Sequence, residues 1–100
     1  MIYRIYIKAQ AGKDIGKVVD YIKDELYDPM AAQRYFDGFD AKINELRFNA
    51  GIFAKSIYKD VLKYDDDARH VLYKGFAIIY SIHGNLILIH RVIHGSLIKS

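Results

Sequence analysis

The chain has 100 residues, enough for one hydrophobic core, and we expect residues 1–100 to fold as a single domain. Hydrophobic residues make up 52% of the sequence and charged residues 27%, a composition typical of globular proteins. The absence of cysteine excludes disulfides and thiolate metal sites. We predict neither a signal peptide nor a membrane span, and therefore expect a cytoplasmic protein with no membrane partner.

The net charge of +3 arises entirely in the second half of the chain. Residues 1–50 contain eight basic and eight acidic residues, whereas residues 51–100 contain seven basic residues against four aspartates. The histidines also lie in this basic half, at positions 70, 83, 90 and 94. Such an end is expected for a protein that binds nucleic acid or an acidic partner, although ordinary surface charge would look the same.

The first half of the chain predicts one strand followed by two helices. Residues 2–8 alternate in polarity with a period of two, which indicates a strand. Between Gly12 and Leu26 apolar residues recur every three or four positions, as on one face of an amphipathic helix. A second helix should begin with Asp28 as N-cap and Pro29 in its first turn, and end near Asn49–Gly51. The short connection predicts that the two helices pack antiparallel.

The second half predicts three strands after an irregular segment at 52–67. The strands cover 69–74, 76–82 and 86–93, separated by Gly75 and by the turn at 83–85. The fold class is therefore α+β with the order β-α-α-β-β-β, a helical hairpin on one face of a four-stranded, mainly antiparallel sheet. Strands 76–82 and 86–89 are apolar on both faces, so the second face must be covered by residues 52–67 or by another chain.

Several motifs follow one another along most of the chain. They are Tyr21-Ile22, residues 28–32, Tyr35-Phe36, residues 43–46, residues 69–80 and the ending Ile89-His90-Arg91-Val92-Ile93-His94-Gly95. Their order and spacing resemble the RelE/ParE superfamily of toxins, the plasmid stabilisation family of type II toxin–antitoxin systems. The resemblance implies a small α/β sandwich neutralised by a cognate antitoxin protein. It also implies one of two activities, cleavage of messenger RNA on the ribosome or inhibition of DNA gyrase.

The same resemblance suggests residues for metal-independent RNA cleavage, which needs a base, an acid and positive charge at the phosphate. It implies that Arg69 contacts the phosphate and that His94 transfers a proton. Arg91 should lie on the strand face opposite His94 and is a candidate for target binding. The candidates for binding the RNA backbone are Lys55, Lys59 and Lys63, which share a face only if their segment is helical.

No metal or other cofactor is expected. His90 and His94 are predicted on the same face of a strand, roughly 13 Å apart, which is too far for a shared ion, and His90 is expected to be a buried core histidine. After Gly95 many relatives have an arginine or an aspartate, where this chain has Ser96-Leu97-Ile98. The leading hypothesis is a ribosome-dependent messenger RNA endonuclease. The alternatives are a ParE-like inhibitor of DNA gyrase without chemistry of its own, or an inactive member that only binds its antitoxin.

Overall fold

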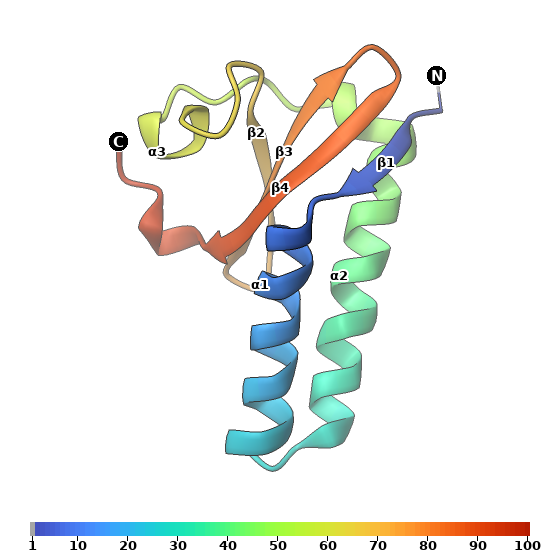
Figure 1. Ribbon diagram of the computed structural model, residues 1–100, viewed down its shortest axis with the longest axis vertical. Coiled ribbons are helices and arrows are strands. Elements are labelled where there is room, and N and C mark those ends of the chain that lie inside the picture. Colours follow the sequence, from blue (N-terminus) through green and yellow to red (C-terminus); the bar gives the residue numbers. More distant parts are fainter. Residues whose placement is uncertain (1) are drawn as a thin grey trace.

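The computed structural model describes residues 2–100 and shows an α+β fold, in which two helices pack against a four-stranded mixed sheet (Figure 1). The far end of the helical hairpin extends beyond the sheet (Figure 1). Among these residues, no helix is both long and apolar enough to cross a membrane. The elements are β1 (Arg4–Ile7), α1 (Ala9–Asp20), α2 (Pro29–Asn49), α3 (Lys59–Leu62), β2 (Arg69–Tyr73), β3 (Phe76–His83) and β4 (Leu86–His94).

The predicted element order is confirmed, with the short helix α3 added in the irregular segment. The start of α2 is also as predicted, because the Asp28 carboxylate accepts the Ala31 N–H at 3.0 Å and Pro29 occupies the first turn. The first helix differs from the prediction. It begins earlier, at Ala9, and changes after Asp20 into a π-helical turn at Tyr21–Glu25.

The strands lie in the order β1-β4-β3-β2. Strands β2, β3 and β4 form the predicted antiparallel meander, whereas β1 pairs in parallel with β4 at the opposite edge. The larger core lies between this sheet and the helical hairpin. Phe39 and Leu46 of α2 pack there against Ile78 and Tyr80 of β3, and all four are at most 1% exposed. The Tyr80 hydroxyl donates to the Ala50 carbonyl at 2.8 Å, so this buried phenol keeps a hydrogen-bond partner.

The second face of the sheet is covered by residues 59–68, called the cover below. Val61 and Ala68 of the cover pack against Ile79 of β3, and all three are fully buried. Tyr64, Ile93 and Ile98 lie around them and are partly buried. Of the two possibilities left open by the sequence, the chain's own irregular segment covers at least this part of the second face.

A β-bulge in β4 corrects one sequence prediction. Ile79 pairs with Arg91 but the next residue, Tyr80, pairs with Ile89, so His90 is the extra residue in β4. The bulge turns both His90 and Arg91 towards the cover, while His94 lies on the helix side. The prediction that His90 and His94 share a face was therefore wrong, because it assumed an unbroken alternation. The predicted burial of His90 is confirmed, since the residue is 5% exposed.

Candidate functional site

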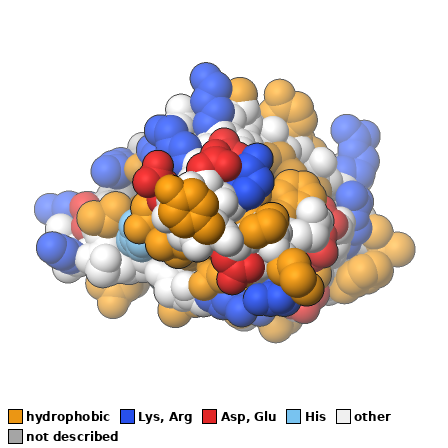
Figure 2. All heavy atoms as spheres, turned by 90° about the horizontal axis from the view of Figure 1, so that it is seen from below, with side chains coloured by type: hydrophobic (Ala, Val, Ile, Leu, Met, Phe, Trp, Pro, Cys, Tyr) orange, Lys and Arg blue, Asp and Glu red, His pale blue; other side chains and the backbone are white. Residues whose placement is uncertain are grey.

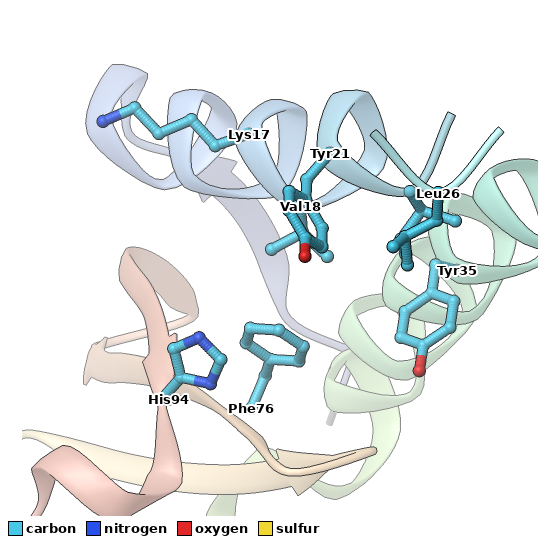
Figure 3. A pocket seen from close by; sticks show the side chains of 8 residues that line it. Lys17, Val18, Tyr21, Leu26, Tyr35, Phe76 and His94 are labelled. Atoms are coloured by element: carbon cyan, nitrogen blue, oxygen red, sulfur yellow. The ribbon is translucent and has the colours of Figure 1, made fainter. Parts of the chain in front are cut away.

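A cleft of about 570 Å³ lies where the helical hairpin meets the ends of β3 and β4. Seen from the hairpin end, this part of the surface shows many hydrophobic side chains among charged ones, with a histidine exposed (Figure 2). In close view, His94 and Phe76 face Val18 and Tyr21 across the cleft (Figure 3). This cleft, called the hairpin cleft below, is lined by Lys17, Val18, Tyr21, Ile22, Leu26, Tyr35, Phe76 and His94.

The helical wall of the hairpin cleft depends on the π-helical turn after α1. There the Leu26 N–H donates to the Tyr21 carbonyl, five residues back, at 3.2 Å. The wider turn leaves Ile22 buried while Tyr21 and Leu26 are each 56% exposed on the cleft. Tyr27 then adopts a left-handed backbone with φ of 53°, which is uncommon for a bulky residue. A non-regular backbone therefore places aromatic and apolar side chains at this surface.

The opposite wall is positioned by the tight turn between β2 and β3. Lys74 and Gly75 both have positive φ, at 47° and 83°, as a two-residue hairpin of type I′ requires. The Gly95 N–H donates to the Gly75 carbonyl at 2.8 Å, which fixes the end of β4 beside this turn. His94 is thereby held against Phe76, with 4.6 Å between the ring centroids. Its side chain remains exposed, so its ring is accessible from the cleft.

Arg69 lies elsewhere and its side chain already has partners. Its Nη1 donates to the Phe53 carbonyl at 2.7 Å, and its Nη2 lies 3.3 Å from the Asp67 carboxylate. The side chain is 16% exposed. In this structure Arg69 therefore fastens the segment after α2 to the start of β2.

Arg69 and His94 are not brought together. Arg69 pairs with Tyr80 and His94 pairs with Phe76, four residues away on the intervening strand β3. This separation is about 13 Å along the sheet, with a further two strand spacings, about 10 Å, across it. One scissile phosphate cannot contact both side chains in this arrangement.

Arg91 forms a largely buried ion pair with Asp14 of α1. Its Nε lies 2.7 Å from Asp14 Oδ2, the same oxygen that accepts the Val92 N–H at 3.0 Å. Burial alone would raise the pKa of Asp14, but hydrogen bonds from Arg91, Val92 and Gln10 outweigh it and lower that pKa. The hydrogen bond that Arg91 donates to Asp14 correspondingly raises the pKa of Arg91. As expected, Arg91 lies on the strand face opposite His94. Its ion pair with Asp14 links β4 to α1.

The three lysines do not form one helical face. Only Lys59 belongs to α3, which has four residues, while Lys55 lies in a segment without regular secondary structure and Lys63 follows the helix end. All three are exposed. Within the described part of the chain, no group of three or more His, Asp or Glu residues is arranged to hold a metal ion.

A family model described as the ParE toxin of the type II toxin–antitoxin system parDE matches residues 5–98. The chain belongs to the ParE toxin family. It is therefore the toxin component of a type II toxin–antitoxin module, with an antitoxin as partner. The RelE/ParE resemblance that the sequence motifs indicated is thereby confirmed.

The fold of this ParE-family toxin is also similar to that of a solved structure. A chain of the structure described as the chromosomal ParDE TA system from P. aeruginosa superimposes with a TM-score of 0.76. The match covers 93% of this chain and 96% of that chain, at 16% sequence identity, so the likeness concerns the fold. No curated protein matches the sequence of the toxin.

Sequence reasoning missed most of the hairpin cleft of this toxin. Tyr21 and Tyr35 were noted as helix residues within the family motifs and Lys17 was not singled out, yet all three lie in one cleft with His94. No local signal marked the cleft, because Ile22 and Leu26 are four residues apart and continue the apolar stripe of a regular helix across Lys23-Asp24-Glu25.

Proposed function

We propose that this ParE-family toxin acts by binding its target and that the target is DNA gyrase. The observation that carries the proposal is the separation of Arg69 from His94. RNA cleavage by an internal 2′-hydroxyl needs a proton-transfer group and a cationic group within hydrogen-bond distance of the same phosphate. The two residues expected to supply these functions lie at opposite ends of the sheet, and Arg69 is occupied by Phe53 and Asp67.

The hairpin cleft supports a binding role. It joins the helical hairpin to the C-terminal strand, so one partner can contact both elements there. Tyrosine, leucine and phenylalanine side chains dominate the lining, and aromatic residues are enriched among the residues that contribute most to protein–protein binding. The exposed side chains of Tyr21 and Leu26 would lose their contact with water in such a complex.

A second candidate, cleavage of messenger RNA on the ribosome, is favoured by one observation. His94 is exposed in the same cleft as Lys17, so a proton-transfer group and a cation line one concave surface. A nuclease of this kind would use Lys17 in the role that the resemblance assigned to Arg69. The ribosome and messenger RNA would then be the partners.

The two candidates are separated by expressing the toxin in growing bacteria without its antitoxin. We expect growth arrest with intact messenger RNA 5′ ends, and inhibition of supercoiling when the purified toxin is added to gyrase. In-frame cuts in translated messages that disappear in His94→Gln would instead establish the nuclease and refute the proposal.

A matched pair of leucine variants tests whether the hairpin cleft is the binding surface. Leu26 lines the cleft and is 56% exposed, whereas Leu97 lies outside it and is 55% exposed. Leu26→Ala should raise the toxin concentration needed for half-inhibition of gyrase by about tenfold, as expected for a residue at the centre of an interface. Leu97→Ala should leave it unchanged. Equal effects of the two variants would exclude the cleft as the gyrase-binding surface.

A further inference from the structure

The cover depends more on polar contacts than the helical hairpin does. Its apolar cluster contains three fully buried residues, Val61, Ala68 and Ile79, whereas the core beneath the hairpin contains twelve buried residues. The Asp67 carboxylate of the cover accepts the Ile82 N–H of β3 at 2.7 Å. Because little apolar surface is buried here, loss of polar contacts should open the cover before the rest of the fold.

A cluster of four polar side chains joins the cover to the middle of the sheet. Asp65 belongs to the cover, Ser81 and His83 to β3, and His90 to the bulge of β4. The Ser81 hydroxyl lies 2.7 Å from His90 Nε2 and 3.0 Å from His83 Nε2. His83 Nε2 also lies 3.0 Å from Asp65 Oδ2. The bulge is what turns His90 into this cluster, and none of the four residues lines the hairpin cleft.

One arrangement of protons gives every contact in this cluster a donor and an acceptor and also gives the Ser81 hydroxyl proton an acceptor. The Asp65 carboxylate accepts hydrogen bonds from the Asp67 N–H and from His83. Burial alone would raise the pKa of Asp65, but these hydrogen bonds outweigh it and lower that pKa, so Asp65 is ionised. His83 must then carry a proton on Nε2, which also faces Ser81. With Ser81 accepting from His83, the remaining contact that can accept its hydroxyl proton is His90 Nε2, and it does so when that nitrogen is unprotonated.

We propose that the neutral His90 ring stabilises the contact between the cover and the sheet, and that protonation of this ring releases residues 59–68 from the sheet. A protonated His90 would direct an Nε2–H at the Ser81 hydroxyl and remove its acceptor. Ser81 is 0% exposed, so its hydroxyl proton could not turn to water without opening the cluster. The charge on His90 would also be buried, because its side chain is 4% exposed.

Burial, more than the surrounding charges, favours the neutral ring of His90 at neutral pH. Burial lowers the pKa of His90, Lys8 and His83 lower it further, and Asp65 opposes them. The neighbouring positive charge of Arg91 is paired with Asp14. Since the pKa in the folded state lies below that in the unfolded state, the stabilisation is complete above about pH 6.5 and decreases as the pH falls.

Hydrogen exchange of the purified toxin at pH 7.5 and pH 5.0, corrected for intrinsic rates, measures the release. Protection of peptides from residues 59–68 should fall several-fold at pH 5.0, while peptides from α2 remain unchanged. His90→Gln keeps a hydrogen-bonding amide but cannot become charged, so it should remove this pH dependence. His94→Gln is the matched control in the same strand, exposed on the other face, and should retain it.

The contribution of His70 to the pH dependence must be distinguished from that of His90. His70 pairs with Ile79 on the cover side, and burial lowers its pKa as well. His70→Gln should retain most of the pH dependence of protection in residues 59–68. The proposal would be overturned if that pH dependence disappeared in His70→Gln or persisted in His90→Gln. If His90→Gln fails to fold, ring-proton NMR of the wild type decides. The midpoint of the His90 ring titration must lie below pH 6.5 and must coincide with the midpoint of the amide changes in residues 59–68. If those amide changes instead followed the titration of another histidine, the assignment to His90 would be refuted.

Discussion

Replacement of Asp14 by alanine should destabilise the toxin by about 3 kcal/mol, because this carboxylate joins α1 to β4 through several hydrogen bonds. Asp14 is 7% exposed, and its loss leaves the buried Val92 N–H without an acceptor, which costs about 1–3 kcal/mol. Loss of the pair with Arg91 adds about 1 kcal/mol, a reduced figure because the arginine is 30% exposed and can be rehydrated. For a chain of this size the sum corresponds to a decrease in Tm of roughly 15 °C.

The assay is urea denaturation followed by circular dichroism, with three variants compared. Asp14→Asn keeps an oxygen for the Val92 N–H and should lose only about 1 kcal/mol. Asp20→Ala, an exposed aspartate in the same helix, is the control and should change stability by less than about 0.5 kcal/mol. If Asp14→Ala is as stable as Asp20→Ala, or if Asp14→Asn is as unstable as Asp14→Ala, the reasoning is refuted.

The pH dependence of the same variants gives an independent check. The pKa of Asp14 is lowered in the folded state, so its stabilisation is present above its ordinary pKa of 3.8 and is lost as the pH falls below it. The difference in unfolding free energy between the wild type and Asp14→Asn should therefore shrink in acid. A constant difference between pH 7 and pH 2 would contradict the charged pair.

Two further substitutions test close packing and a buried hydroxyl. Gly38→Ala should destabilise the fold by about 1 kcal/mol in urea denaturation, because the added Cβ would overlap the hydroxyl end of the Tyr73 side chain. Overpacking costs about 1–3 kcal/mol, which outweighs the gain of about 1 kcal/mol in helix propensity from replacing glycine by alanine. In a Tyr73→Leu background the clash is absent, so Gly38→Ala should there increase stability. If Gly38→Ala alone were more stable than the wild type, the close contact with Tyr73 would be contradicted. Tyr80→Phe should cost about 1–3 kcal/mol, since it leaves the buried Ala50 carbonyl without its donor. Burial also raises the pKa of Tyr80 to about 12, so stability should fall above pH 10 in the wild type but less in Tyr80→Phe, as measured by denaturation at pH 8 and pH 11.

The secondary structure was largely predictable because its signals are local. The Asp28-Pro29 start of α2 and the Gly75 turn before β3 follow from backbone chemistry that neighbouring residues alone determine. The parallel pairing of β1 with β4 was not predicted, since nothing in residues 4–7 specifies a partner more than eighty positions away. Nor was the π-helical turn at Tyr21–Glu25, in which Ile22 is buried.

The candidate site was less predictable than the fold, for two physical reasons. A single inserted residue at the bulge changes the face of every earlier residue in β4, so His90 was placed on the wrong side. The hairpin cleft combines residues from α1, α2, β3 and β4, and only tertiary packing brings Lys17 and Tyr35 to His94. Arg69 was recognised as a basic residue at the start of a strand, but its contacts with Phe53 and Asp67 are not visible in the sequence.

The pairing of β1 with β4 has a consequence for when the toxin can become complete during its synthesis. The helical hairpin and the β2–β3 pair involve neighbouring parts of the chain, whereas Arg4–Ile7 can pair only after Leu86–Ile89 has been made. Contacts over such long separations in sequence form late and slowly. A nascent chain that ends before β4 also lacks His94, and with it one wall of the hairpin cleft. The hairpin cleft is therefore complete only after β4 has been synthesised.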